Sequence, residues 1–409
     1  MKQSLVCLSA LTVAVACSSN GPSSGGGAGA AGAAAVAGAS AVAGAGGGGG
    51  GAPSGSAGSV SAMAGSSGSV AVGGGGAAGA SAIAGAGGAV GGSGGGGTAG
   101  TAGSGGAPAS TAFKCPTGPF AALDIGAGKA ARVPGAPPVD DFNKSHGNVE
   151  GPVWIGDSLY FSEMTDGDLP PARILKLAPG GTVSVAVMDS GSNGLAVDAK
   201  GMLFAAVHKD GSVSQVALPS GPLTPVVSKY NGMRFTSPND LAIRSDGTIY
   251  FSDPKYQNSA NPQGAERLYW VTPGPTRTVT AVTGAPGTPN GVTLSADEKT
   301  LYVSGSGLKK FTVNADGSLT NPTDVPGGSG GDGMVLDCSG NLYVATGNNV
   351  QIIMAAGGAA KAITVDGGAS ITNVAFGAMD HKTLYVTAQG NQGQRGVFSI
   401  VLNVPGFPY

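Results

Sequence analysis

Between residues 149 and 402 the chain alternates short apolar runs with short polar breaks. The runs are rich in Val, Ile, Leu and aromatic residues, and each is bounded by Gly, Asp, Asn or Pro. Such runs are typical of β-strands, and no long segment shows a helical period. We predict strands at 159–161, 173–177, 196–198, 203–207, 213–218, 241–243, 249–252, 268–271, 301–304, 308–313, 342–345, 350–354, 384–387 and 397–402.

These runs belong to a pattern that occurs six times. Each copy opens with a residue whose side chain carries an oxygen, and the steps between copies are 43, 46, 51, 42 and 41 residues. We call these openers the ring residues: Glu150, Asn193, Asn239, Asn290, Asp332 and Asn373. A turn residue follows seven positions later: Asp157, Lys200, Asp246, Asp297, Ser339 and Asp380. An aromatic residue comes three to five positions after the turn: Tyr160, Phe204, Tyr250, Tyr302, Tyr343 and Tyr385.

A repeat of this length, with about four short strands per unit, indicates a β-propeller. The predicted fold is therefore all-β: a six-bladed β-propeller over 113–409, preceded by a disordered Gly/Ala/Ser-rich linker. The lead-in 113–149 contains a possible strand at 120–125, and we expect this lead-in to supply a strand that closes the last blade. A residue at one register in every inner strand points to one place on the propeller axis.

The N-terminal part of the chain has a different composition. Residues 1–17 predict a lipoprotein-type signal peptide, because a short apolar run ends in small residues before Cys17. Lipidation of Cys17 would anchor the exported protein at the bacterial cell envelope, at the outer membrane or surface; the alternative is an ordinary cleaved signal. Residues 18–112 are almost wholly Gly, Ala, Ser, Val and Thr, and predict a disordered linker. Such a coil would reach roughly 55 Å.

Charge limits the kinds of partner that the chain can bind, and its cysteines indicate a disulfide. The chain has 21 Lys and Arg against 23 Asp and Glu, so nothing favours nucleic acid, and a membrane would be contacted only through the lipid anchor. We expect a monomer. Cys115 and Cys338 remain in the folded part, and export to an oxidising compartment favours one disulfide between them over two free thiols.

The ring residues predict a metal site. All six present an oxygen and two are carboxylates, whereas no imidazole or thiolate takes part. Oxygen ligands of this kind suit one divalent cation, Ca²⁺ before Mg²⁺, Mn²⁺ or Zn²⁺. The alternative is that Asn-Gly and Asp-Gly pairs at these positions only form turns. Each blade already has a separate turn seven residues later, which favours the metal.

Four blocks in this order resemble the signature of the regucalcin (senescence marker protein)/gluconolactonase family. They are Glu150-Gly151-Pro152-Val153-Trp154, Ser237-Pro238-Asn239-Asp240, Pro289-Asn290-Gly291 and Asp332-Gly333-Met334. The resemblance covers 145–402 and implies a six-bladed propeller with one catalytic divalent ion in its channel. It also implies the metal ligands Glu150, Asn239, Asn290 and Asp332, with Asn239 also orienting substrate.

The resemblance implies hydrolysis of sugar or related lactones. A metal would polarise the lactone carbonyl, and a carboxylate would take a proton from the attacking water. Asp332 is the predicted base. Predicted substrate-binding residues are Asn239, Asn193, Asp253, Tyr256 and His208, although His208 could instead belong to a Lys-Asp-Gly turn.

Two other functions fit the same pattern. One is hydrolysis of a different ester, such as a phosphotriester or an aryl ester, at the same metal. The other is a non-catalytic propeller that binds a ligand and holds a structural ion. No nucleophile elbow, zinc-protease motif or phosphate loop offers another catalytic mechanism in the folded part.

Overall fold

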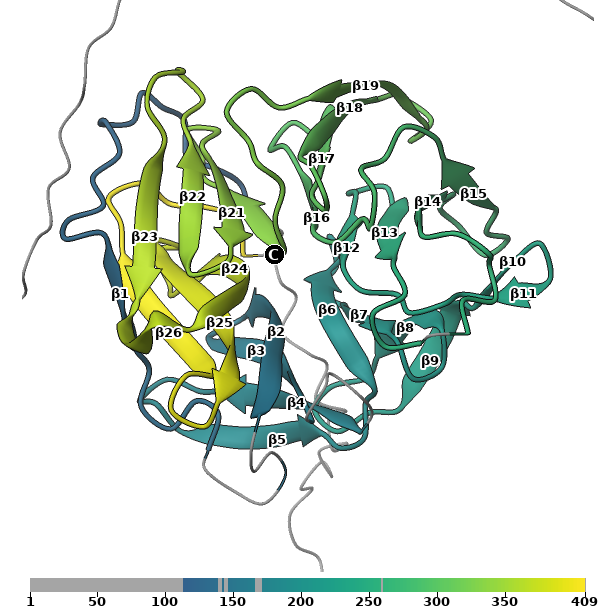
Figure 1. The fold of residues 1–409 in the computed structure, drawn as a ribbon, viewed down its shortest axis with the longest axis horizontal. Coiled ribbons are helices and arrows are strands. Elements are labelled where there is room, and N and C mark those ends of the chain that lie inside the picture. The colour runs from purple at the N-terminus through teal and green to yellow at the C-terminus, as the bar shows by residue number, and fades with distance from the viewer. Residues whose placement is uncertain (1–112, 139–141, 143–145, 166–170, 259, 409) are drawn as a thin grey trace, which may run out of the picture. The chain divides into compact units, whose positions relative to one another are not determined.

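The computed structural model describes residues 113–138, 142, 146–165, 171–258 and 260–408. The signal peptide and linker predicted for 1–112 lie outside the described residues. Within them nearly all regular structure is β-strand, with one short 3-10 helix at Asp366–Gly368. The strands are grouped as small twisted sheets around a common centre (Figure 1). The all-β propeller predicted from the sequence is confirmed.

Antiparallel pairing arranges most strands in six sets of four, and two further pairings join three of these sets into one 12-stranded sheet. The first three sets are β2 (His146–Ile155), β3 (Ser158–Met164), β4 (Ala172–Leu177), β5 (Val183–Val187); β6 (Ser192–Val197), β7 (Leu203–Val207), β8 (Ser212–Val216), β9 (Leu223–Val227); and β12 (Leu241–Ile243), β13 (Ile249–Asp253), β14 (Arg267–Val271), β15 (Val279–Val282). A two-stranded hairpin, β10 (Lys229–Tyr230) and β11 (Met233–Arg234), lies between the second and third sets.

The remaining sets complete the circle. They are β16 (Val292–Leu294), β17 (Thr300–Val303), β18 (Lys309–Val313), β19 (Leu319–Asp324); β20 (Met334–Leu336), β21 (Leu342–Thr346), β22 (Asn349–Ile353), β23 (Lys361–Val365); and β24 (Ser370–Gly377), β25 (Thr383–Asn391), β26 (Gly396–Val401), β1 (Lys129–Arg132). The inner strands β2, β6, β12, β16, β20 and β24 contact one another in sequence, and β24 contacts β2.

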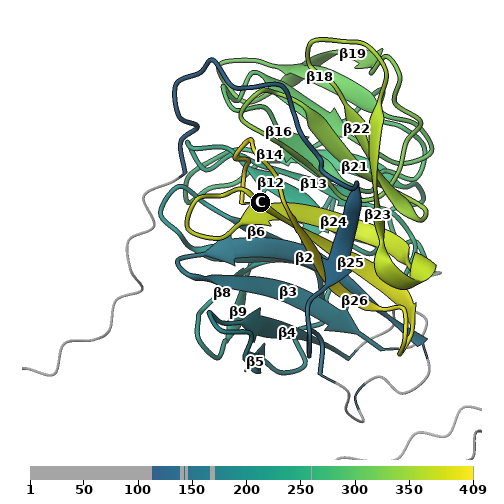
Figure 2. The same cartoon turned by 90° about the vertical axis from the view of Figure 1, so that its left-hand side faces the viewer.

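The sixth set is closed by the N-terminal lead-in. Strand β1 pairs antiparallel with β26, so the first and last strands of the folded part lie side by side (Figure 2). Closure by the lead-in occurs as expected, but the predicted strand was wrong. Residues 120–125 form no strand, and the pairing instead uses 129–132. A propeller closed in this way exposes fewer unpaired strand edges.

Apolar side chains fill the spaces between adjacent sheets. Separate buried clusters join the first set to the second, the second to the third and the third to the fourth. The largest cluster joins the fifth and sixth sets and also takes up Leu123 of the lead-in. Both faces of each sheet are covered by a neighbouring sheet, which explains why the strands are continuous apolar runs separated by polar breaks.

A disulfide ties the lead-in to the fifth set. Cys115 and Cys338, the pair predicted for an exported chain, are joined with their Cα atoms 5.4 Å apart. The bond spans 223 residues of chain, so it closes a long loop and restricts the unfolded state.

Within the described residues, no helix has the length and apolar character needed to cross a membrane.

Candidate metal and catalytic site

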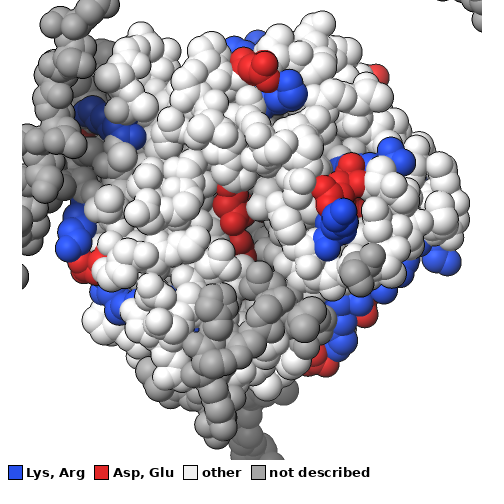
Figure 3. All heavy atoms as spheres, viewed as in Figure 1, with Lys and Arg blue, Asp and Glu red and all other residues white. Residues whose placement is uncertain are grey.

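The ring residues converge on one cavity of about 330 Å³ at the centre of the propeller. Five of the six line it. The complete lining is Asn148, Glu150, Asn193, Asn239, Tyr256, Gln257, Asn290, Asp332 and Gln389. Acidic side chains lie in a hollow at the middle of the face that Figure 3 shows. All four predicted metal ligands therefore face one space.

Local backbone geometry aims each ring residue inward. In β2, β6 and β24 the pairing register shifts at or beside Glu150, Asn193 and Asn373, and such bulges re-aim side chains. In the other three sets the ring residues donate their N–H to the second strand: Asn239 to Ser252 (3.0 Å), Asn290 to Ser304 (2.9 Å) and Asp332 to Ala345 (2.8 Å). The predicted hairpin turns lie at the other end of each inner strand.

Glycine follows the ring residue in four blades, and close approach of the next blade requires it. An added Cβ would lie 2.6 Å from Asn193 O at Gly151, 2.6 Å from Asn239 O at Gly194, 2.4 Å from Asp332 O at Gly291, and 1.9 Å from Asn373 Cγ at Gly333. These glycines thus lie at contacts between blades. The Asn-Gly and Asp-Gly pairs serve the tight closure of the ring, and the hairpin turns are elsewhere.

Glu150 is the most buried acid of the ring. Burial, then the negative charges of Asp332 and Asp240, raise the pKa of Glu150 well above its usual value. A Gly151 N–H at 3.1 Å and a hydrogen bond from the Asn373 side chain act in the opposite direction. Asn373 does not line the cavity. Its side chain instead hydrogen bonds to Glu150 and so orients that carboxylate. The Asn373 Oδ1 accepts the Val374 N–H at 2.8 Å.

Two amide oxygens of the ring have no hydrogen-bond partner. They are Asn193 Oδ1 and Asn290 Oδ1, and both side chains are buried. Asn290 also hydrogen bonds to Tyr256 through its side chain, so its Oδ1 remains as the acceptor. Unsatisfied buried oxygens cost about 1–3 kcal/mol each. The Asn290 oxygen and the Glu150 and Asp332 carboxylates form an oxygen-rich donor set that fits a hard divalent cation, while the Asn193 oxygen stays open to another hydrogen-bond donor.

The donor chemistry also limits which metal site this could be. Among the described residues, no group of three or more His, Cys, Asp and Glu side chains is arranged to hold a metal ion by itself. The ring instead mixes two carboxylates with four amides. This composition favours an oxygen-binding cation over a dedicated zinc site.

A third acid, missed in the sequence analysis, lies directly behind the ring. Asp240 is buried, and its carboxylate accepts the N–H of Leu241 (2.9 Å) and of Val292 in the next blade (3.0 Å). Burial raises the pKa of Asp240 to about 7, against those two hydrogen bonds. Hydroxyls make similar links, since Ser252 Oγ donates to Asn290 O at 2.5 Å and Ser304 Oγ to Asp332 O at 2.6 Å. These contacts fix the spacing of ring residues on neighbouring blades.

Asp253 does not line the cavity. It is fully buried, and its two carboxylate oxygens accept the N–H groups of Thr236 (2.9 Å) and Ser237 (2.6 Å). Burial raises the pKa of Asp253 to about 6. The carboxylate holds the segment that leads to Asn239, so this geometry gives it a positioning task. The predicted direct contact with substrate stays a prediction.

His208 also lies outside the cavity lining. Its side chain is 3% exposed, and neither ring nitrogen has a hydrogen-bond partner. Burial lowers the pKa of His208 to about 4. The residue is a neutral buried imidazole next to β7, and its predicted contact with substrate stays a prediction.

Because His208 is buried with a lowered pKa, we expect the folded protein to lose stability in acid. Between pH 6.5 and about 4 the unfolded chain takes up a proton at this residue while the folded protein does not. By about pH 4 this difference in protonation lowers the free energy of unfolding by about 3 kcal/mol. We expect His208→Leu to remove that part of the decline in urea unfolding free energy between pH 7 and 4. Above pH 7 the two proteins should differ by a constant amount, and an unchanged acid slope would contradict the assignment.

Three cavity residues were missed by the sequence analysis. Asn148 lies two residues before Glu150 on β2, and since side chains alternate along a strand the two share a face. That signal was available. Gln257 lies in the loop after β13 and Gln389 near the end of β25, and nothing in the sequence connects either to the repeat.

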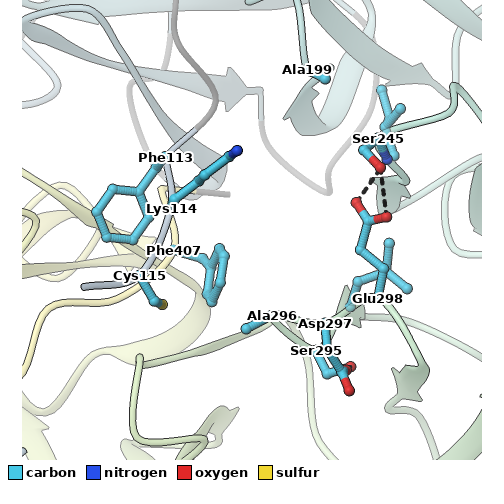
Figure 4. Close-up of a pocket in the computed structure, with 12 residues that line it drawn as sticks. Phe113, Lys114, Cys115, Ala199, Ser245, Ser295, Ala296, Asp297, Glu298 and Phe407 are labelled. Atoms are coloured by element: carbon cyan, nitrogen blue, oxygen red, sulfur yellow. Dashed lines mark hydrogen bonds between the residues drawn. The ribbon is translucent and has the colours of Figure 1, made fainter. Parts of the chain in front are cut away.

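A second cavity, of about 460 Å³, contains none of the ring residues. It lies against the hairpin turns that follow the inner strands β6, β12 and β16, and against both ends of the folded part (Figure 4). Phe113, Lys114 and Phe407 form one side, while Glu298 on the other accepts two hydrogen bonds from Ser245 (both 2.7 Å). The smaller cavity, which contains five of the ring residues, is therefore the candidate site.

Comparison with known proteins identifies the family of this chain. Residues 149–390 match the family model described as the SMP-30/Gluconolactonase/LRE-like region. A gluconolactonase of Zymomonas mobilis is 29% identical over 59% of this chain and 76% of its own length. A gluconolactonase structure from Xanthomonas campestris has a TM-score of 0.55 at 26% identity, covering 72% of this chain and 98% of that one.

A more distant structure shows the same fold. The calcium-binding protein regucalcin of Agrobacterium tumefaciens has a TM-score of 0.50 at 20% identity, covering 65% of this chain and 97% of its own. The family match at 149–390 includes all six ring residues. The chain belongs to the SMP-30/gluconolactonase/LRE-like family.

Proposed function

We propose that this protein is a divalent-metal-dependent lactonase acting on sugar or related lactones. One observation carries the proposal: the carboxylates of Glu150 and Asp332 and the side chain of Asn290, whose buried Oδ1 has no hydrogen-bond partner, face a single central cavity. The lactone-hydrolysing relatives supply the reaction class. We infer Ca²⁺ as the cation, because every ring donor is an oxygen.

We assign different roles to the ring residues. Glu150, Asn239, Asn290 and Asp332 would hold the cation, which when bound supplies Lewis-acid polarisation of the lactone carbonyl. Asp332 takes a proton from the attacking water, whose oxygen adds to the carbonyl carbon. The C–O bond of the lactone ring then breaks, and the departing oxygen takes the proton that Asp332 accepted, which gives a hydroxy acid and restores the carboxylate. Tyr256, which is 48% exposed, lines the cavity and is hydrogen-bonded to Asn290, would contact the substrate.

Removal of the metal tests the proposal. We expect the full chain to release acid from glucono-δ-lactone above the spontaneous rate, to lose this activity in EDTA, and to regain it with Ca²⁺. Zn²⁺ should restore less activity, because the ring offers no nitrogen or sulfur ligand. Mg²⁺ and the similarly small Mn²⁺ should also restore less, because Ca²⁺ accepts more protein oxygens in a more flexible geometry. A pH-stat assay measures the rates, and calorimetry measures binding of each ion.

The same assay separates the alternatives. If the protein hydrolyses phosphotriesters or aryl esters but no lactone, the proposed metal site stands and the substrate class is a different ester. A folded protein that binds Ca²⁺ but hydrolyses none of these compounds would contradict the enzyme and favour a ligand-binding propeller.

A further inference from the structure

Outside the four proposed metal ligands, neutral amides dominate the central cavity. They are Asn148, Asn193, Gln257 and Gln389, with Tyr256 as the only other member of the lining. No Lys, Arg or His belongs to this lining, as far as the described residues show. The space beside the metal site is therefore polar without being positively charged.

Asn148 is the most informative of these amides. It is 6% exposed, and its Oδ1 has no hydrogen-bond partner. Burying an amide oxygen in this way is unfavourable unless another group supplies a hydrogen-bond donor. Since Asn148 lines the cavity on the same strand face as Glu150, a hydroxyl of a bound substrate can supply that donor.

The other amides each keep one group for a ligand. Gln257 Oε1 accepts the Ser237 hydroxyl at 2.5 Å, which leaves its NH₂ as the remaining donor. Gln389 Nε2 donates to Ser370 Oγ at 3.5 Å, which leaves its Oε1 as an acceptor. Asn193 Oδ1 adds another acceptor without a partner. Hydroxyl groups both donate and accept, so they match this mixed set.

Charge argues against an anionic substrate. Glu150 and Asp332 line the cavity and Asp240 lies behind it. One divalent cation would balance the two lining carboxylates and leave no positive charge for a phosphate or carboxylate. Such a group would meet amide oxygens and negative charge, which costs binding free energy.

We propose that Asn148, Asn193, Gln257 and Gln389 form a hydroxyl-binding subsite that selects uncharged, polyhydroxylated lactones, with Asn148 as its specificity-determining residue. This inference rests on the proposed lactonase function. The amides would bind the hydroxyls of the lactone ring while the metal site acts on its carbonyl. A site built to bond hydroxyls discriminates strongly against analogues that lack them.

Three substrates test the subsite: glucono-δ-lactone, δ-valerolactone without hydroxyls, and anionic 6-phosphoglucono-δ-lactone. We expect the wild-type protein with Ca²⁺ to prefer glucono-δ-lactone over both by kcat/KM. Asn148→Leu should lower kcat/KM for glucono-δ-lactone by about 10- to 100-fold, mainly through KM, and change the value for δ-valerolactone by less than about threefold. Because Asn148 Oδ1 has no partner, the variant should keep its Tm.

Gln351→Leu is the matched control, since this amide lies on β22 in the fifth set, outside the cavity lining. It should leave all three values unchanged. Gln389→Leu provides a second variant and should repeat the selective loss. Equal losses on glucono-δ-lactone and δ-valerolactone, or a wild-type preference for the phosphorylated lactone, would overturn the subsite and leave the lactonase intact. Absence of hydrolysis with every lactone would instead reject the lactonase itself.

Discussion

Asp332→Asn is expected to lower kcat for glucono-δ-lactone by about 1000-fold at saturating Ca²⁺, the range typical of a lost general base. Asparagine keeps an oxygen that can ligate a cation but cannot accept the proton of the attacking water. The backbone of Asp332 should stay in place, because its carbonyl accepts the Ser304 hydroxyl at 2.6 Å and its N–H donates to Ala345 at 2.8 Å. Pre-steady-state and steady-state acid release, with Ca²⁺ titrated for each protein, measure the effect.

Asp297→Asn is the matched control for this substitution. Asp297 occupies the hairpin turn seven residues after Asn290, at the other end of the inner strand, and accepts the Ser295 hydroxyl at 2.7 Å. Asparagine can accept the same bond, so kcat should stay within about twofold of wild type. If Asp332→Asn keeps wild-type turnover once Ca²⁺ is saturating, Asp332 is a ligand only and another group must act as the base.

Gly291→Ala is expected to lower stability by about 3 kcal/mol, the upper range for overpacking. The added Cβ would lie 2.4 Å from Asp332 O, 2.8 Å from Ser304 Oγ and 2.9 Å from Gly333 Cα. Two of these atoms belong to backbone, so relief requires the fourth and fifth blades to move apart. This should lower Tm by roughly 5 °C and weaken Ca²⁺ binding, because Asn290 and Asp332 would separate. Calorimetric unfolding with and without Ca²⁺ measures both effects.

Gly307→Ala provides the comparison in the same blade. A Cβ at Gly307 meets nothing within 4 Å, so stability should change by less than about 1 kcal/mol. Equal stability of Gly291→Ala and wild type would show that the blades can relax at the ring, contrary to the tight closure described above.

The regular repeat is the part of this fold that sequence patterns reveal best. Strands at 203–207 and 241–243 were predicted with the bounds that the structure has, because apolar runs between turn residues define them locally. Outer strands such as β19 were missed. Most of its side chains are exposed, so no apolar face marks it, and only pairing with β18 makes it a strand.

The sequence by itself determined the propeller repeat and the six ring residues, whereas the resemblance to a family selected four of them as proposed metal ligands. It could do so because a fixed register in every inner strand maps onto one axis, whatever the surrounding loops do. Tertiary structure decided which neighbours surround that axis. It placed Asp240 behind the ring and added Gln257 and Gln389 to the cavity lining, but left Asp253 and His208 outside it. Those positions depend on loops and on contacts between blades far apart in the chain, which no local pattern encodes.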